Sequence, residues 1–159
     1  MISGRIKELT SINELSTTEY TIVKVVKAED MPRIKLGDRK ILYSCKIYLK
    51  AGINMDKYDP SKTEFNEIEK TASIVLPHAT LFSFNMPPEE QRLEYIKVDV
   101  LRKRISQKER NDLLIQGEEI VRKQIESIGI IEDAERNARD IFSVALTQLG
   151  FHIIDIKFE

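Results

Sequence analysis

The chain has only one cysteine, two histidines and no tryptophan among its 159 residues. The single thiol, Cys45, excludes an internal disulfide and does not distinguish an oxidising from a reducing compartment. No apolar run approaches the roughly 18 to 20 residues that a membrane-spanning helix needs. A formal net charge of -1 excludes a strong overall attraction to nucleic acid, so no nucleic-acid partner is expected.

Motifs that carry chemistry are missing as well. The chain has no nucleophile elbow, dinucleotide-binding glycine fingerprint, phosphate-binding loop, Cys-x-x-Cys pair or zinc-protease signature. Cys45, His78 and His152 could form a metal site or a nucleophilic pair, but no two of them lie at a typical metal-ligand spacing. A lone cysteine or histidine on an apolar strand face is usually a core residue. We therefore expect no metal, no cofactor and no catalytic residue, and a non-enzymatic role is favoured over an enzymatic one.

The sequence is organised around residues 40–51 (KILYSCKIYLKA), in which apolar and polar positions alternate. The apolar positions are Ile41, Tyr43, Cys45, Ile47, Leu49 and Ala51. A strand turns successive side chains to opposite faces, so this stretch predicts a strand with one buried face. Further strands are predicted at residues 17–26, 71–84, 93–101 and 151–158. Residues 87–90 (PPEE) predict the start of a helix, and residues 93–101 could instead be the tail of that helix. Because Pro77 cannot donate to a ladder, the strand at 71–84 is expected at a sheet edge or interrupted at this residue.

Two apolar stripes at helical spacing follow in the C-terminal part of the chain. Ser106 and Glu109 form a predicted capping box that begins the first helix. Gly129 interrupts the stripe, and a second stripe runs to Gly150, a residue typical of the position after a helix end. These stripes predict two helices, or one helix bent at Gly129.

Together these patterns predict an α+β fold. A largely antiparallel sheet is expected to be covered on one face by the two C-terminal helices (or one bent helix), with a final C-terminal strand. The length fits a single domain, 1–159. Residues 1–16 carry apolar side chains at spacings of three and four, which predicts a short helix or a loosely docked lead-in.

One dense basic cluster lies around the start of the first helix. It consists of Arg102, Lys103, Arg104, Lys108 and Arg110. Free backbone N–H groups at a helix start attract an anion, and the five cations would add to that attraction. The alternative is a solvated surface balanced by Asp99, Glu109 and Asp112, which is what most surface charge runs are. The cluster is therefore the candidate anion-binding site, weighed against an ordinary charged surface.

Five segments of the chain also carry a recognisable order of motifs. They are residues 39–45 (RKILYSC), 50–54 (KAGIN), 76–79 (LPHA), 132–139 (EDAERNAR) and 149–151 (LGF). This order resembles the uncharacterised bacterial family known as domain of unknown function 4230, and the resemblance extends from about Glu14 to Phe158. Asn54 is a small departure, because the family often has Asp at this position.

The resemblance implies no reaction, ligand or functional residue, since none is established for the family. Its members often carry an N-terminal membrane anchor or lipoprotein signal, which implies a domain tethered to a membrane in the bacterial cell envelope. No such segment precedes the domain within the 159 residues. We therefore expect Met1 to follow directly on an anchor in the natural protein.

The favoured function is thus a non-enzymatic interaction or structural module of a membrane-tethered bacterial protein, acting through a protein partner or self-association. The alternative is a small-molecule or anion-binding domain that uses the basic cluster at the start of the long helix. A hydrolase built on Cys45 and a histidine is a third, less favoured reading.

Overall fold

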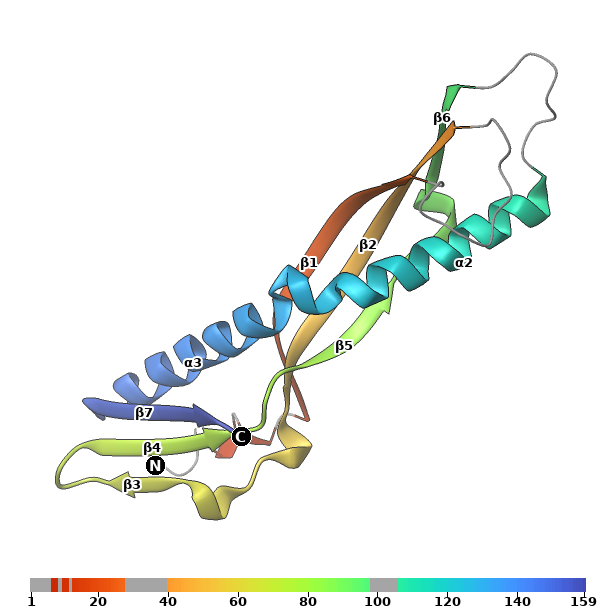
Figure 1. Cartoon of the computed structure of the whole chain (residues 1–159). Helices are drawn as coiled ribbons and strands as arrows, with labels where there is room; N and C mark the ends of the chain where they lie inside the picture. Colours follow the sequence, from red (N-terminus) through yellow and green to blue (C-terminus); the bar gives the residue numbers. More distant parts are fainter. Residues whose placement is uncertain (1–6, 9, 12, 28–39, 98–105) are drawn as a thin grey trace. The chain divides into compact units, whose positions relative to one another are not determined.

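The computed structural model describes residues 7, 8, 10, 11, 13–27, 40–97 and 106–159. Its strands are β1 (Glu14–Lys27), β2 (Lys40–Asn54), β3 (Glu64–Asn66), β4 (Thr71–Leu76), β5 (Thr80–Asn85), β6 (Arg92–Lys97) and β7 (Ile153–Phe158). Its helices are α2 (Gln107–Gln124) and α3 (Ile130–Gln148), and short 3-10 turns occupy Met55–Lys57, Pro60–Lys62, Pro88–Glu90 and Ile125–Ile128. Both sheets and helices are present, so the predicted α+β class, the C-terminal helices and the final strand are confirmed (Figure 1).

The strands form two sheets. In the first, β1, β2 and β5 are neighbours in that order, and β6 pairs antiparallel with β2. In the second, β3 and β4 pair antiparallel and β4 pairs in parallel with β7. The predicted interruption at Pro77 is confirmed, because β4 ends at Leu76 and the chain resumes as β5 at Thr80 in the other sheet. One proline without a ladder donor thus separates two strands that the alternation alone had joined.

The chain divides into two compact units. The first contains Lys50–Ser83 and Gly129–Glu159, together with described residues before Tyr20. The second contains the described parts of Tyr20–Leu49 and Phe84–Ile128. Boundaries between the units fall within β1, β2 and β5, so each unit is assembled from segments that are distant in sequence. The expectation that residues 1–159 behave as one domain stays a prediction.

In the first unit, α3 covers the inner face of the sheet β3–β4–β7 (Figure 1). Alternate residues of β4 are buried on this face, namely Ala72, Ile74 and Leu76. The helix contributes a buried stripe at spacings of four: Ile130, Ala134, Ala138, Phe142 and Leu146. The small alanines let the helix backbone approach the sheet closely, while Ile130, Phe142 and Leu146 supply the apolar bulk.

The start of β1 is held to α3 by hydrogen bonds that involve the helix backbone and one side chain. The Thr17 hydroxyl donates to the Ala134 carbonyl at 2.8 Å. The Asn137 amide donates to the Thr17 carbonyl at 3.2 Å and to the Thr18 hydroxyl at 2.8 Å. These bonds satisfy polar groups that β1 places beside the helix.

In the second unit, α2 packs on the face of β2 that carries the odd-numbered residues. Tyr43, Cys45 and Ile47 are fully buried there, as the alternation predicted. Gly117 allows this contact, since a Cβ at its position would lie 2.7 Å from Tyr43 Cε1. The predicted capping box is confirmed: the Ser106 hydroxyl accepts from the Glu109 N–H, and the Glu109 carboxylate accepts from the Ser106 N–H.

The break between the helices also follows the prediction. Gly129 has φ +81°, a left-handed conformation that side chains avoid, and α3 begins directly after it. Gly150 has φ +95° and ends α3 in the same way. Among the described residues, neither helix is long and apolar enough to cross a membrane.

Candidate functional site

The structure locates only part of the predicted basic cluster. Arg102, Lys103 and Arg104 lie outside the described residues. Lys108 and Arg110 lie exposed on the first turns of α2. The cluster as a whole therefore stays a prediction, and only Arg110 enters the geometry described below.

The cysteine and the histidines are dispersed. Cys45 is 0% exposed under α2, which confirms its assignment to the core. The expectation of a core position was wrong for His78 and His152, which are both exposed. His78 lies after β4 has ended at Leu76, so the strand alternation no longer applies to it, and its Nδ1 contacts the Glu135 carboxylate at 2.8 Å. Among the described residues, no group of three or more His, Cys, Asp or Glu side chains could hold a metal ion.

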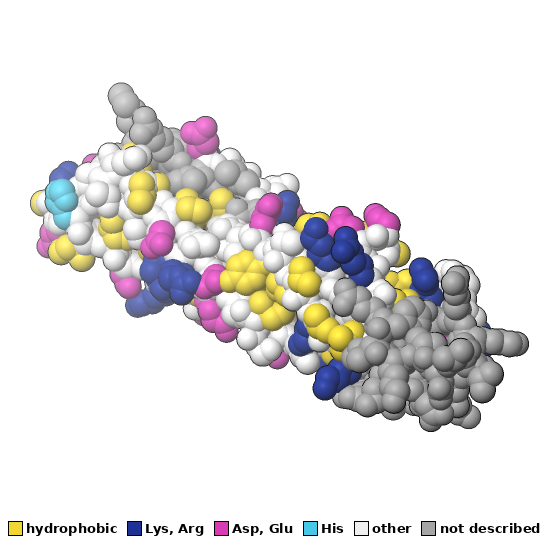
Figure 2. Space-filling model, turned by 90° about the horizontal axis from the view of Figure 1, so that it is seen from above, with side chains coloured by type: hydrophobic (Ala, Val, Ile, Leu, Met, Phe, Trp, Pro, Cys, Tyr) yellow, Lys and Arg dark blue, Asp and Glu magenta, His cyan; other side chains and the backbone are white. Residues whose placement is uncertain are grey.

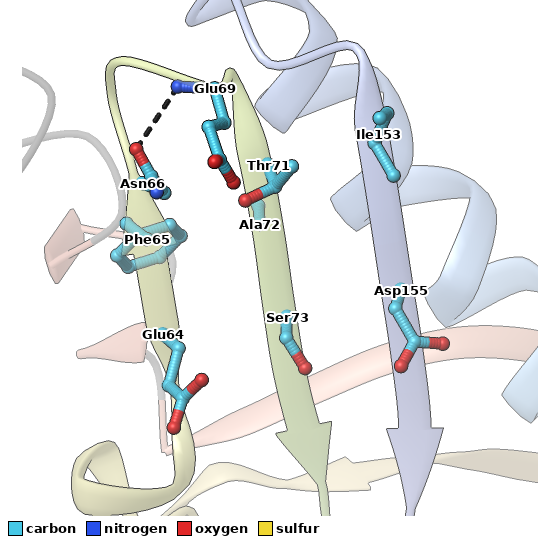
Figure 3. Close-up of a pocket in the computed structure, with 9 residues that line it drawn as sticks. All are labelled: Glu64, Phe65, Asn66, Glu69, Thr71, Ala72, Ser73, Ile153 and Asp155. Carbon is cyan, nitrogen blue, oxygen red and sulfur yellow. Dashed lines mark hydrogen bonds between the residues drawn. The ribbon is translucent and has the colours of Figure 1, made fainter.

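The outer face of the sheet β3–β4–β7 carries an open groove of about 640 Å³. Its lining is shown in Figure 3 and consists of Glu64, Phe65, Asn66, Glu69, Thr71, Ala72, Ser73, Ile153 and Asp155. The groove lies on the side of the sheet opposite α3, because the lining residues of β4 that alternate with Ala72 point outward.

Strand register arranges the groove in two rows across the sheet. Glu64, Ser73 and Asp155 are directly aligned in one row. Asn66, Thr71 and Ile153 are aligned in the other. The outer strands of a three-stranded sheet lie about 10 Å apart, so the Glu64 and Asp155 carboxylates flank the Ser73 hydroxyl from both sides. In the first row, the Ser73 hydroxyl therefore lies between two carboxylates.

The charge of this groove is of one sign. Among the residues that the structure describes, the lining has three carboxylates, from Glu64, Glu69 and Asp155, and no Lys or Arg. Lys157, on the same strand face as Asp155, contacts that carboxylate at 3.2 Å, and this exposed ion pair contributes little. By contrast, Figure 2 shows basic, acidic and apolar side chains interspersed over the face in view. The groove is therefore a local acidic feature in a chain of nearly balanced charge.

Apolar side chains are exposed at the same sheet. Ile153 is 65% exposed within the groove, and Ile68, in the turn between β3 and β4, is 94% exposed. Phe65 is partly exposed and contacts the Phe151 ring at a centroid distance of 5.4 Å. Exposed large apolar residues beside polar groups are typical of surfaces that bind a protein segment.

A second, smaller pocket of about 280 Å³ lies in the other unit, beside α2. It is lined by Tyr43, Pro88, Gln91, Arg92, Leu93, Arg110 and Leu114. Tyr43 is 1% exposed, and its buried hydroxyl has no hydrogen-bond partner among the described residues. Such a hydroxyl costs about 1 to 3 kcal/mol of stability. Burial also raises the pKa of the Tyr43 phenol, so the group keeps its proton and remains a donor at neutral pH.

Gln91 holds one wall of this pocket in place. The β2–β6 ladder ends at the pair Ser44 and Arg92, and the Gln91 side chain continues it by binding the next free backbone groups of β2. Its Oε1 accepts from the Lys46 N–H, and its Nε2 donates to the Lys46 carbonyl, both at 2.9 Å. The same Nε2 donates to the Pro87 carbonyl at 2.8 Å. A side-chain amide thus replaces a missing strand residue and fixes the start of β6.

Next to this wall, Glu90 joins β2 through two contacts. Its carboxylate accepts from the Tyr48 hydroxyl at 2.6 Å and lies 3.1 Å from Lys46 Nζ. The hydrogen bond from Tyr48, followed by those from Lys46, holds the pKa of Glu90 below its usual value. The helix start predicted at residues 87–90 was wrong: Pro88–Glu90 forms a single 3-10 turn, and the Glu90 side chain ties it to β2.

Comparison with known proteins agrees with the motif order seen in the sequence. The sequence model of a family described as "Protein of unknown function (DUF4230)" matches residues 7–156. The chain belongs to this family. No curated protein and no solved structure matches it. The family's description names no reaction and no ligand.

Sequence reasoning missed both hollows for the same reason. The row of Glu64, Ser73 and Asp155 exists only because β4 pairs in parallel with β7, some 80 residues later in the chain. Tyr43 was assigned to the core correctly, but no pattern in the sequence shows that its hydroxyl has no partner. Alternation indicates which residues face outward, and it does not indicate which outward residues become neighbours.

Proposed function

We propose that the chain is a non-enzymatic interaction module that binds an extended, basic segment of a partner protein in the groove on β3–β4–β7. The observation that carries this proposal is the row in which the Glu64 and Asp155 carboxylates flank the Ser73 hydroxyl. Two carboxylates about 10 Å apart attract a Lys or Arg side chain that enters between them. The Ser73 hydroxyl offers that cation a further acceptor.

The shape of the groove supports an extended occupant. Side chains of an extended segment that point to one side recur about 6 to 7 Å apart, so a segment laid over the two rows meets each row with a different side chain. The first row favours a cation, and the second, with Ile153 exposed, favours an apolar side chain. A segment with a basic residue and an apolar residue two positions apart places both on the same side and matches both rows. Charge complementarity of this kind increases both the specificity and the association rate.

We further propose that this module belongs to a membrane-tethered bacterial protein, in which the groove faces a partner at the envelope. The support is the resemblance in motif order to a family whose members often carry an N-terminal anchor. Sequencing of the gene upstream of Met1, or fractionation of the natural protein, tests this part directly. Recovery of the natural protein in the soluble fraction would contradict it.

Binding of a defined peptide tests the groove. The probe is a fluorescein-labelled peptide in which lysine and valine lie two positions apart with threonine between them, and its counterpart carries glutamate in place of lysine. We expect the lysine peptide to raise fluorescence anisotropy at low ionic strength and the glutamate peptide to have no effect. Glu64→Gln and Asp155→Asn should each weaken binding about two- to fivefold, which corresponds to roughly 0.5 to 1 kcal/mol for an exposed ion pair.

The matched control is Asp140→Asn on α3, which removes the same charge from an exposed site outside the groove. We expect it to leave the affinity unchanged within error. Ile153→Ala should also weaken binding of the lysine peptide. It should not alter the salt dependence of binding, because it removes only an apolar contact. Equal effects of Asp140→Asn and Asp155→Asn, or no uptake of the lysine peptide, would refute the groove as the binding surface.

A further inference from the structure

We infer that the pocket beside α2 binds a small oxyanion carried by a compact apolar group. This site is separate from the acidic groove: it lies in the other unit, and its lining carries the opposite charge. The pocket of about 280 Å³ lies near the lower end of the size range of ligand sites, which limits the occupant to a small molecule or a headgroup.

Two guanidinium groups supply the charge. Arg92, at the start of β6, and Arg110, on α2, both line the pocket, and its described lining residues include no carboxylate. Within the described part of the chain, neither arginine forms an ion pair. Arg92 also borders a neighbouring hollow that contains Glu89 and Glu90, but the Glu90 carboxylate is engaged by Tyr48 and Lys46. Guanidinium groups bind carboxylate, phosphate and sulfate through paired hydrogen bonds.

The Tyr43 hydroxyl supplies the independent observation. It belongs to a side chain that lines the pocket, and it is buried with no partner in the part of the chain that the structure describes. Buried polar groups in folded proteins nearly always have a partner, so an unpartnered one next to two arginines indicates a missing acceptor. An oxyanion provides that acceptor. The Gln91 amide is not available for this purpose, because both its oxygen and its nitrogen bind backbone groups.

The remaining walls are apolar and select the rest of the ligand. Pro88, Leu93 and Leu114 contribute them. A bare inorganic ion would leave these surfaces in contact with water, whereas a compact apolar group would cover them. The pocket therefore favours a phosphate, sulfate or carboxylate attached to such a group over the free ion. Arg110 is also a member of the predicted basic cluster, and the pocket gives it defined neighbours.

Titration with phenyl phosphate tests the inference, with inorganic phosphate and benzyl alcohol as comparison ligands. Calorimetry and the ligand-induced rise of the thermal midpoint both report binding. We expect phenyl phosphate to bind, inorganic phosphate to bind more weakly and benzyl alcohol not to bind. Arg110→Gln and Arg92→Gln should each weaken phenyl phosphate at least about tenfold, as expected for a lost charged hydrogen bond.

Tyr43→Phe separates ligand binding from a merely structural role. The free variant should be no less stable than the original chain, because the hydroxyl it loses has no partner in the structure. Its affinity for phenyl phosphate should nevertheless fall about three- to tenfold. The matched control is Lys108→Gln, which removes a charge from the same end of α2 without lining the pocket, and it should change the affinity less than about twofold.

Three results would contradict the inference that this pocket binds an oxyanion. The first is no uptake of phenyl phosphate, and the second is equal loss in Lys108→Gln and Arg110→Gln. The third is that the double variant Arg102→Glu and Arg104→Glu no longer binds phenyl phosphate while Arg110→Gln still does. This result would assign the anion to the predicted basic cluster. A separate experiment adds vesicles of anionic phospholipid to the complex with phenyl phosphate. If the vesicles displace phenyl phosphate, the oxyanion belongs to a lipid headgroup. If they do not, it belongs to a free small molecule.

Discussion

The Cys45 thiol is covered by α2 and has no exposed surface. Burial raises its pKa to about 12, with a smaller opposing effect from Lys24. At pH 8 the reactive thiolate is then roughly one part in ten thousand, and it increases only as the pH rises toward that value. We expect a chromogenic disulfide reagent to label the native chain slowly and the chain in concentrated guanidinium rapidly. Native labelling at the rate of a free thiol would contradict this and would support the nucleophile reading.

Residue environments were predictable where a strand or helix continued through the residue. Cys45 lies in the middle of β2, so its burial followed from alternation. His78 follows the end of β4 and Pro77, so the same argument failed for it. Its actual partner, the Glu135 carboxylate on α3, lies 57 residues away in the chain. Partner identity of this kind depends on tertiary packing, which no local pattern encodes.

At the scale of elements, the contact between α2 and β2 depends on one glycine. Replacing a helix glycine with alanine usually adds about 1 kcal/mol of stability. At Gly117, however, the new Cβ would lie 2.7 Å from Tyr43 Cε1 and 3.3 Å from Cys45 Sγ. Both neighbours are fully buried and cannot move aside easily. Overpacking costs about 1 to 3 kcal/mol, so we expect Gly117→Ala to destabilise the chain or at best leave it unchanged.

Chemical denaturation of Gly117→Ala measures this balance. The control is Lys123→Ala, an exposed position of the same helix, for which we expect a change within about 0.5 kcal/mol. If Gly117→Ala instead gained the roughly 1 kcal/mol expected from helix propensity alone, α2 would not pack closely on β2.

Elements and their ends were more predictable than their partners. The capping box at Ser106 and the break at Gly129 followed from residue chemistry, because both act within one turn of chain. The pairing of β4 with β7 was not predictable, since parallel strands need a long connection and the sequence does not specify which strand receives it. The candidate groove depends on that pairing, so it became visible only in the structure.

At the scale of the whole molecule, the two compact units share three strands of the chain. β1, β2 and β5 each contribute residues to both units, so unfolding one unit releases strands that the other uses. We therefore expect a single cooperative transition, in agreement with the predicted single domain. The chain provides a test, because Cys45 reports on the second unit alone and Phe142 stabilises the first.

Phe142→Ala should cost about 3 to 5 kcal/mol, because it removes a fully buried aromatic ring from the stripe of α3. If the units unfold together, the denaturant midpoint for exposure of the Cys45 thiol should fall as far as the midpoint measured by circular dichroism. Leu113→Ala, in the second unit, is the matched control. It should lower the thiol midpoint and the circular dichroism midpoint by the same amount. A thiol midpoint that stays unchanged in Phe142→Ala, while the circular dichroism splits into two transitions, would establish two independently folding domains in place of one.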